Sequence, residues 1–253
     1  RALQLGVIQQ AAASAAEAVQ GCDIVLLAVP VSRTAECLQA IASSLSPDCL
    51  LMDVGSTKTD VVQAAIAHLG ERLNCFVPAH PIAGKAQAGV DHAEASLYED
   101  RRAILTPLTQ TGATQLQQAQ QVWKAIGSHV SLMTPPAHDA TFAAVSHVPH
   151  LLAFAAVNAL SAQPQGAGFL AMAGPGFRDF SRIAASDPDV WRDILSANQA
   201  EVLTQTRHFR AALEQFEKAI QSNDLEALRQ LIDQASQVRS GWALQTGPAE
   251  HED

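Results

Sequence analysis

The spacing of apolar and polar positions changes near residue 134 of this chain. Before that point, short unbroken apolar runs alternate with stretches in which apolar residues recur every three or four positions. Unbroken apolar runs are typical of strands buried on both faces, and helices between them are typical of the crossover connections of a parallel sheet. The pattern predicts strands at residues 23–30, 49–54, 75–77, 103–106 and 129–133, and helices at 35–45 and 59–69. Residues 1–133 are therefore expected to form an α/β domain around a parallel sheet.

Beyond Thr134-Pro135-Pro136 the strand signals stop, and residues 134–253 are expected to form an all-α domain. The predicted helices cover residues 139–160, 190–220 and 224–238. The longest of these has a seven-residue repeat with a second row between its members: Leu195, Val202, Phe209 and Phe216, with Thr206, Leu213 and Ile220. Such a seam, close to that of a coiled coil, packs lengthwise against another helix, in its own domain or in a second subunit. One small helical domain offers too few partners for so long a stripe, so we expect this domain to dimerise.

Composition excludes several classes of function. The 253 residues are 48% apolar and carry a formal net charge of −9, with no run of lysine or arginine. Nucleic acids and anionic membranes need a concentrated basic surface, so we expect a small-molecule partner instead. The four cysteines form no CxxC pair, which favours free thiols in a reducing compartment and a cytoplasmic protein. No apolar run reaches the roughly 20 residues that a membrane helix needs, so no membrane span is expected.

Ligands of doubly wound sheets bind at the carboxyl ends of the strands, which directs attention to three segments. Ala28-Val29-Pro30 ends the first predicted strand, residues 53–58 end the second, and residues 80–84 follow the third. Prolines and glycine-serine turns are also ordinary loop residues, and Ser56 could instead cap the helix at 59–69. The candidate ligand contacts at the first two strand ends are Ala28, Val29, Pro30, Gly55 and Ser56.

His80 is the candidate general base. Histidine is the side chain whose unperturbed pKa lies close to neutral pH, and Pro81 limits the backbone freedom of this one. A lone histidine in a loop is more often a structural residue than a catalytic one, so that alternative stays open.

The helical half contains a second polar cluster. In the segment Ser146-His147-Val148-Pro149-His150, the proline should kink the helix, and the two histidines share one face. No cysteine or acidic residue completes the spacing of a metal site there, so no metal is expected.

Two arginines follow farther along the chain. Arg178 and Arg182 lie one helical turn apart beside Phe177 and Phe180. A guanidinium can grip a carboxylate with two hydrogen bonds, although arginines near aromatic rings are as often simply solvated or stacked. Histidine, serine and arginine side chains together suggest an anionic substrate that loses a proton. Asp187-Pro188 is typical of a helix start.

Several segments occur in an order that resembles a known family: DVGSTK at 53–58, HPIAG at 80–84, LYE at 97–99 before ILTP at 104–107, SHVPH at 146–150, and FRDFSRIA at 177–184. Over nearly its whole length the chain resembles the prephenate and arogenate dehydrogenases of tyrosine biosynthesis. The resemblance implies a Rossmann-like domain followed by a helical dimerisation domain, and a homodimer. It also implies oxidative decarboxylation of prephenate or arogenate to 4-hydroxyphenylpyruvate or tyrosine, with hydride transfer to NAD or NADP.

The resemblance also implies roles for single residues. His80 matches the histidine that accepts the hydroxyl proton of the substrate, Ser56 the serine near that hydroxyl and the nicotinamide, and Arg182 the arginine that grips a substrate carboxylate. The other candidates for the substrate pocket are Ser146, His147, His150, Asp179 and Trp191. Lys85 departs from the family pattern. A cation there would favour the keto-acid side chain of prephenate over the ammonium-bearing side chain of arogenate.

One feature expected from the family does not occur in this sequence. It contains no GxGxxG loop for a pyrophosphate, and the resemblance begins only after the second strand of the dinucleotide-binding domain. Residues that separate NAD from NADP are therefore not readable, and the sequence either starts late or is a fragment. One alternative is thus a non-catalytic dimerising or ligand-binding fragment. A β-hydroxyacid dehydrogenase is a weaker alternative, because it would carry a catalytic lysine where His147 and His150 occur.

Overall fold

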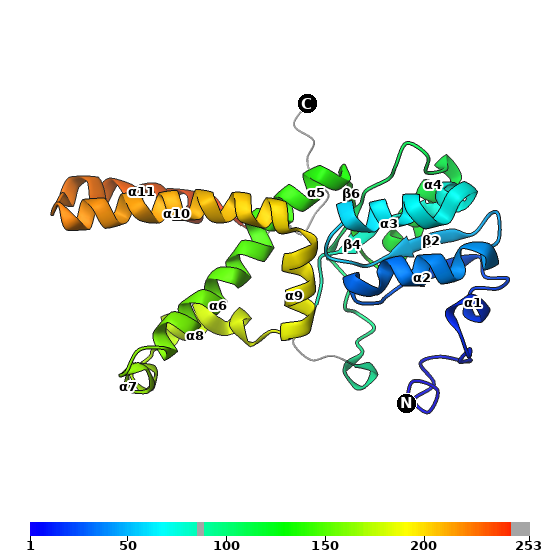
Figure 1. Ribbon diagram of the computed structural model, residues 1–253, viewed down its shortest axis with the longest axis horizontal. Helices are drawn as coiled ribbons and strands as arrows, with labels where there is room; N and C mark the ends of the chain where they lie inside the picture. The colour runs from blue at the N-terminus through cyan, green and yellow to red at the C-terminus, as the bar shows by residue number, and fades with distance from the viewer. Residues whose placement is uncertain (85–88, 244–253) are drawn as a thin grey trace.

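The computed structural model describes residues 1–84 and 89–243 and has two parts that meet near residue 134. The first part (Figure 1, right) contains the strands, and the second (left) is helical. The helices of the first part are α1 (Ala15–Ala18), α2 (Thr34–Ile41), α3 (Thr59–Leu69) and α4 (Ala113–Ala125). Those of the second are α5 (Pro135–Phe142), α6 (Val148–Ser161), α7 (Gly166–Ala171), α8 (Pro175–Ser181), α9 (Pro188–Ala197), α10 (Gln199–Gln221) and α11 (Leu225–Gly241).

Six strands occur among the described residues. β1 (Ile24–Leu27), β2 (Leu50–Asp53) and β3 (Phe76–Val77) are parallel neighbours in this order. β4 (Ala79–Pro81), β5 (Arg102–Leu105) and β6 (His129–Leu132) form a second set, in which β5 and β6 are parallel. All five predicted strands thus take part in parallel pairs. β4 was not predicted and runs antiparallel to β5, so His80 lies on a short strand and not in a loop.

The core of the first part surrounds β2, which is buried along its whole length. On one side it packs against α2 and α3 through Leu38 and Val61, and on the other against Trp123 of α4, a helix that the pattern did not predict. β1 differs, because Ile24 and Leu26 are 49% and 46% exposed. The expectation that both faces of this strand are buried is wrong for the described residues, since none of their helices covers that face.

The helix predicted at 139–160 starts earlier and is interrupted. α5 begins after Thr134, whose hydroxyl accepts a hydrogen bond from the amide of Ala137, with Pro135 in the first turn. A π-helical turn at Ala143–His147 separates α5 from α6. Pro149 lies just after this turn and cannot donate a helical hydrogen bond. The predicted irregularity is therefore a widened turn on the N-terminal side of the proline.

The combined helical stretch Pro135–Ser161 is 27 residues long, and an 18-residue window within it has a mean hydropathy of 1.5, so by length and composition alone it could cross a membrane. The sequence analysis considered only unbroken apolar runs, and polar residues interrupt this stretch. In this structure the stretch carries His138, Asp139 and His147, which are buried and have polar partners. Buried polar groups with partners on other elements are what a core helix of a folded domain requires.

The helix predicted at 190–220 is two helices, α9 and α10, that run in different directions (Figure 1). They meet at Asn198, whose backbone leaves the helical conformation with φ −103° and ψ 33°. The Asn198 side chain is buried, and its Nδ2 donates to the carbonyl oxygen of Asp139 at 2.8 Å and to Nδ1 of His147 at 3.2 Å. These contacts with α5 and the π turn hold the corner. The predicted seam is split, with Leu195 on α9 and Val202, Phe209 and Phe216 on α10.

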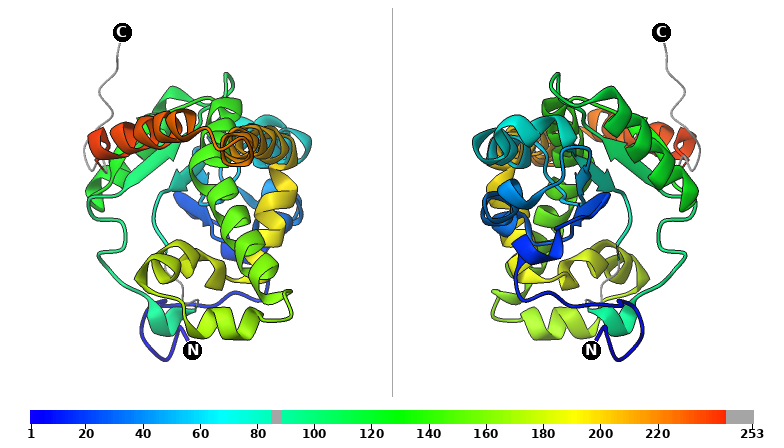
Figure 2. Two further views of the ribbon diagram at one scale, coloured as in Figure 1. Left: turned by 90° about the vertical axis from the view of Figure 1, so that its left-hand side faces the viewer. Right: turned by 90° about the vertical axis from the view of Figure 1, so that its right-hand side faces the viewer.

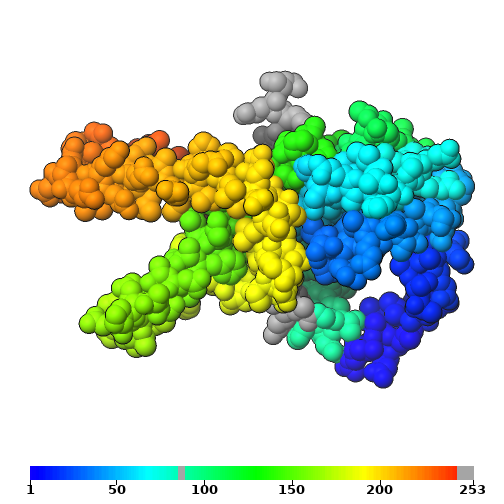
Figure 3. Space-filling model, in the orientation of Figure 1, coloured from blue at the N-terminus to red at the C-terminus, as the bar shows by residue number. Residues whose placement is uncertain are grey.

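The second part ends in two projections. α10 and α11 lie side by side as an antiparallel pair, here called the long arm, which confirms that α10 packs lengthwise on a helix of its own chain (Figures 1 and 2). The α6, α7 and α8 helices form a second projection, here called the short arm. A wide gap separates the two arms on the surface of the single chain (Figure 3).

Candidate active site

A cavity of about 680 Å³ lies where the two parts meet. β4 and the segment after β2 line it from the first part, and α6, α9 and the turn after α8 line it from the second. Seven of the predicted site residues line it: Ser56, His80, Ser146, His147, His150, Arg182 and Trp191. The fold therefore brings residues from five distant segments of the sequence to one place.

Among the described residues, one predicted substrate-pocket residue does not line this cavity. Asp179 lies on α8 and its carboxylate accepts from Nε of Arg178 at 3.0 Å on the exposed surface, outside the cavity lining. Arg182 is one turn farther along, at the start of a 3₁₀ turn, and it reaches the cavity. Lys85 lies outside the described residues.

His80 has one defined partner. Its Nδ1 lies 2.8 Å from Nε2 of His138, and its ring contacts the edge of the Phe142 ring with centroids 4.8 Å apart. No described residue hydrogen-bonds its Nε2. Burial lowers the pKa of His80 well below its usual value, and the neighbouring His138, Lys58 and His147 act in the same direction, while Asp139 opposes them. The side chain is therefore neutral at physiological pH, as a base must be.

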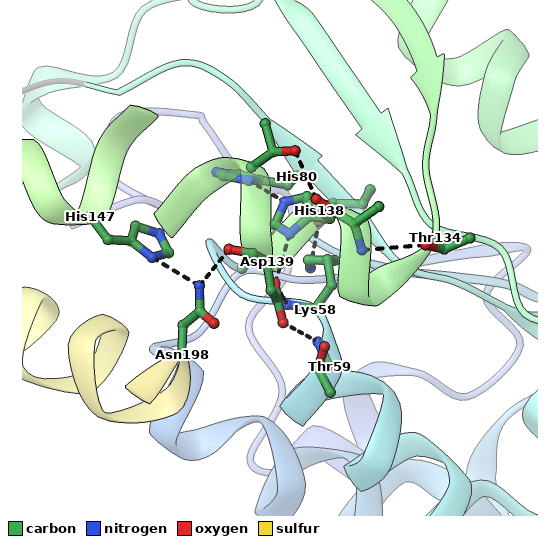
Figure 4. Close-up of polar contacts among 12 residues, drawn as sticks. Lys58, Thr59, His80, Thr134, His138, Asp139, His147 and Asn198 are labelled. Atoms are coloured by element: carbon green, nitrogen blue, oxygen red, sulfur yellow. Dashed lines mark hydrogen bonds and ion pairs between the residues drawn. The ribbon is translucent and has the colours of Figure 1, made fainter. Parts of the chain in front are cut away.

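His138 and Asp139 lie behind His80, and the sequence analysis missed both (Figure 4). His138 is fully buried, and its Nδ1 lies 2.8 Å from Oδ1 of Asp139. The carboxylate also accepts from the backbone amides of Lys58 at 2.9 Å and Thr59 at 2.8 Å. Burial alone would raise the pKa of Asp139, but the hydrogen bonds from His138, Thr59 and Lys58 outweigh it and lower that pKa. The only sequence signal was an adjacent histidine and aspartate at the start of the second part.

Lys58 and Asp53 form a buried ion pair beneath the site. Asp53, the last residue of β2, also accepts from the backbone amides of Gly55 at 2.8 Å and Ala79 at 3.0 Å, and Nζ of Lys58 donates to the Ala79 carbonyl oxygen at 2.8 Å. The pair thus ties the end of β2 to β4, which positions Ser56 and His80. The residue before α3 is Lys58, and the side chain that accepts from the amides at the start of this helix is that of Asp139, so the alternative that Ser56 is a helix cap is wrong.

His150 and Trp191 form the opposite wall of the cavity. Their rings are stacked, with centroids 3.6 Å apart and an interplanar angle of 20°. Nδ1 of His150 donates to the carbonyl oxygen of Ser146 at 2.9 Å, which orients the ring. Burial lowers the pKa of His150, and the Arg182 charge adds to this effect. Trp191 is on α9, whose start at Asp187 is capped as the sequence predicted: the carboxylate accepts from the second and third amides that follow.

The predicted cofactor edge is formed by the ends of β1 and β2. Ala28, Val29 and Pro30 follow β1, and each is at least partly exposed. A Cβ added at Gly55 would lie 3.0 Å from Oδ2 of Asp53 and 3.5 Å from Cγ2 of Val31. A glycine is therefore suited to this close approach of the end of β2 to Val31, and the strand ends are where a doubly wound sheet binds a dinucleotide. The residues present fit the nicotinamide end of a dinucleotide.

The cofactor edge is in direct contact with the substrate wall. Ser32, in the 3₁₀ turn Val31–Arg33 after β1, donates from its hydroxyl to a carboxylate oxygen of Asp193 on α9. Asp193 is two residues from Trp191. The cavity thus has a neutral histidine, a guanidinium and an aromatic wall, and the predicted cofactor edge adjoins it.

Two protein-family models match this chain. "Prephenate dehydrogenase, nucleotide-binding domain" matches residues 1–132, and "Prephenate dehydrogenase, dimerization domain" matches residues 134–234. The chain belongs to the prephenate dehydrogenase family. The predicted Rossmann-like domain followed by a helical dimerisation domain is thereby confirmed, as is the resemblance on which it was based.

Individual members of the family are similar over most of this chain. The cyclohexadienyl dehydrogenase of Zymomonas mobilis is 32% identical over 88% of this chain and 76% of its own length. The prephenate dehydrogenase of Bacillus subtilis is 34% identical over 96% of this chain but 66% of its own length, so this chain spans about two thirds of that protein. The crystal structure of prephenate dehydrogenase from Aquifex aeolicus, in complex with hydroxyphenyl propionate and NAD+, is 35% identical with a TM-score of 0.87, covering 94% of this chain and 83% of that one.

Family membership decides between the alternatives left open by the sequence. The protein is an NAD(P)-dependent dehydrogenase of the prephenate dehydrogenase family, and the non-catalytic alternative is not supported. NAD is supported as a cofactor of the family by the A. aeolicus complex.

Proposed function

We propose that this protein catalyses the oxidative decarboxylation of prephenate to 4-hydroxyphenylpyruvate. The observation that carries the proposal is His80, a neutral histidine held from behind by His138, which lines the same cavity as Arg182. A base and a guanidinium on one cavity suit a substrate that has both a hydroxyl group and a carboxylate. The names of the Z. mobilis and B. subtilis relatives support the same class of substrate.

In the proposed reaction, His80 takes the proton of the ring C4 hydroxyl while the C4 hydride leaves, and the ring carboxylate departs as carbon dioxide. The ring becomes aromatic, which makes the reaction favourable. Bound NAD(P) supplies the hydride acceptor at the edge formed by Ala28, Val29, Pro30 and Gly55. Ser56, between this edge and His80, is proposed to hydrogen-bond the reacting hydroxyl.

The far wall of the cavity is proposed to bind the rest of the substrate. Arg182 grips a carboxylate, and the stacked pair of His150 and Trp191 bounds the ring, with Ser146 and His147 in support. Asp179 is not part of the proposal, because it pairs with Arg178 away from the cavity.

The finer choices of substrate and cofactor follow the same reasoning. We propose prephenate over arogenate because the cavity wall carries the cationic group of Arg182. A second cation, Lys85, directly follows the cavity residue Gly84 in the sequence. We propose NAD as the cofactor, which agrees with the NAD+ bound in the A. aeolicus complex. Initial rates with each of the two substrates and each of the two cofactors would measure both preferences.

We also propose the oligomeric state, the location and the domain boundary of this enzyme. A homodimer is supported by the dimerization-domain match, and a cytoplasmic location by the free cysteines. We place the boundary between the nucleotide-binding and helical domains at residues 133 and 134.

The experiment that tests the proposed function is a steady-state comparison of wild type and His80→Asn in the full-length protein. The variant should lower kcat for prephenate by about 10²–10⁴-fold with KM within about threefold, because a general base contributes to the chemical step and little to binding. His68→Asn, on the last turn of α3, is the matched control and should keep both constants. An His80→Asn enzyme within about tenfold of wild-type kcat would contradict the assignment of the base.

A further inference from the structure

A chain of three side chains runs from the cavity into the protein: His80 on β4, then His138 and Asp139 on α5 (Figure 4). Each step is a contact of 2.8 Å between a ring nitrogen and the next acceptor or donor. We propose that His138 and Asp139 are positioning residues that fix the tautomer of His80 and share the positive charge it acquires. This inference rests on the proposed function, in which His80 is the base.

Asp139 determines which atom donates in each of these hydrogen bonds. Its Oδ1 accepts from the backbone amide of Lys58 and its Oδ2 from that of Thr59, so the carboxylate is held as an acceptor on both oxygens. The third partner of this carboxylate, Nδ1 of His138, must then be a donor. Asp139 is 3% exposed, and its position cannot adjust freely because it is fixed to the start of α3.

The same logic continues to the cavity. A neutral histidine with its proton on Nδ1 has a lone pair on Nε2, so His138 accepts a hydrogen bond from Nδ1 of His80. His80 then has its proton on Nδ1 and its lone pair on Nε2, the nitrogen to which no described residue hydrogen-bonds. The chain of contacts therefore selects the one neutral tautomer of His80 that can take a proton from a substrate in the cavity.

The contacts from His80 through His138 to Asp139 also stabilise the positive charge that the reaction creates on His80. When the hydroxyl O–H bond of the substrate breaks, the proton forms a bond to Nε2 of His80, and the ring becomes an imidazolium. Its Nδ1 proton can then be shared with Nε2 of His138, whose own Nδ1–H stays bonded to the ionised Asp139. The other charged or titratable groups near these rings are Lys58 and His147, which disfavour the imidazolium, and Asp53, which pairs with Lys58. Asp139 is the anion that offsets them.

A purely structural role for this pair is the alternative to be tested. Asp139 links α5 to the start of α3, and the His138 ring packs on Phe142 with centroids 4.5 Å apart, so either could serve only to hold the two parts together. A structural role would change stability and binding and would affect the glutamine and leucine variants of His138 alike. The split between kcat and KM, together with the comparison of those two variants, therefore separates the two interpretations.

The first variant is Asp139→Asn in the full-length protein, assayed for kcat and KM with prephenate from pH 5 to 9. An asparagine loses one backbone hydrogen bond in either orientation, because only one of its two terminal atoms can accept. The orientation that turns its amide NH₂ toward His138 also reverses both histidine tautomers. We expect kcat to fall at least about 100-fold with KM within about threefold. Because the Asp139 charge raises the pKa of His80, the acid limb of the kcat profile should also move to lower pH. Unchanged kcat, or a lower kcat with an unmoved acid limb, would overturn the proposal.

The second test is a pair of variants that lose the same ring packing, His138→Gln and His138→Leu. The glutamine carbonyl can still accept from Nδ1 of His80 and keep its tautomer, whereas leucine cannot. We expect the glutamine variant to stay within about tenfold of wild-type kcat and the leucine variant to fall about 100-fold. Equal activity of the two would overturn the proposal, and His68→Gln serves as the control for replacing a histidine elsewhere.

The two hypotheses fail in different ways. If His80→Asn keeps its activity, the proposed base is wrong and the positioning role falls with it. If His80→Asn is inactive while Asp139→Asn and His138→Leu retain kcat, only the positioning role is wrong. Thermal unfolding and binding of the product 4-hydroxyphenylpyruvate, measured for each variant, identify loss of folding as the cause of a low rate.

Discussion

His147 illustrates how the fold sets the charge of a single residue. Its side chain is 1% exposed, and its Nδ1 accepts a hydrogen bond from Asn198. Burial lowers the pKa of His147 to about 4; Asp139 opposes this shift, and His138 and His150 add to it. The sequence predicted a histidine on the substrate face, but only its burial explains why it stays neutral.

This burial predicts a pH-dependent stability. The unfolded chain binds a proton at His147 near pH 6.5 and the folded chain only near pH 4, so stability is fully present above pH 6.5 and is lost as the pH falls toward 4. When the pH falls from 7.5 to 5, the protonation of this one group should lower the free energy of unfolding by about 2 kcal/mol. Urea unfolding of wild type and His147→Gln at both pH values would measure it, because the glutamine does not titrate.

The comparison of the two proteins is the control for other groups. Burial also lowers the pKa values of His80, His138 and His150, so wild type and variant should both lose stability in acid. The variant should lose about 2 kcal/mol less. An equal loss in the two proteins would show that His147 is protonated without penalty.

At the scale of elements, the corner between α9 and α10 decides where Trp191 lies. Asn198 makes this corner and donates to α5 and the π turn, which carry Asp139 and His147. Without the corner, the seam of residues 190–220 would continue as one helix and Trp191 would not stack on His150. The corner is therefore a link between the helical architecture and the cavity.

Removing the side chain of Asn198 should weaken this link. Asn198→Ala leaves the buried Asp139 carbonyl oxygen and His147 Nδ1 without this partner, which should lower the free energy of unfolding by about 1–3 kcal/mol. It should also raise KM for prephenate, because α9 loses its anchor. Denaturant unfolding at equal protein concentration and steady-state kinetics measure the two effects. Asn158→Ala, at an exposed position of α6, should change the unfolding free energy by no more than about 0.5 kcal/mol.

At the scale of the whole molecule, the single chain leaves much apolar surface on its long arm. Leu203, Phe209, Leu213 and Ile220 of α10 are between 39% and 63% exposed. A hollow of about 620 Å³ between α10 and α11 is lined by Phe216, Leu231 and Trp242, among others. Apolar patches of this extent mark association surfaces, which agrees with the dimerization-domain match and with the proposed homodimer.

A charge placed on this surface should disrupt the dimer. Leu213→Glu, at a side chain that is 46% exposed in the single chain, should shift the protein from dimer to monomer, because a second copy would have to bury the carboxylate. Light scattering after size-exclusion chromatography measures the mass. Ile66→Glu, at a 55% exposed residue of α3, is the control and should stay dimeric. A dimeric Leu213→Glu protein would place the interface elsewhere.

Much of the fold was predictable because periodicity is a local property of the chain. The strands predicted at 49–54 and 129–133 correspond to β2 and β6, and Asp187-Pro188 starts α9 as predicted. The order of the short motifs was enough to indicate the family. Among site residues, those with distinctive motifs, such as His80 and Arg182, were found and do line the cavity.

Contacts between distant segments were not predictable, because they depend on the path of the chain and not on any local pattern. His138 and His80 are 58 residues apart in the sequence, and no spacing rule joins them. The corner at Asn198 depends on hydrogen bonds to α5, and β4 exists because Ala79–Pro81 lies next to β5. The sequence by itself determined the type and order of the main elements, the family and the principal candidate residues. Only the tertiary structure decided which side chains support the base and which polar groups are buried, since burial and pairing arise when separate segments meet.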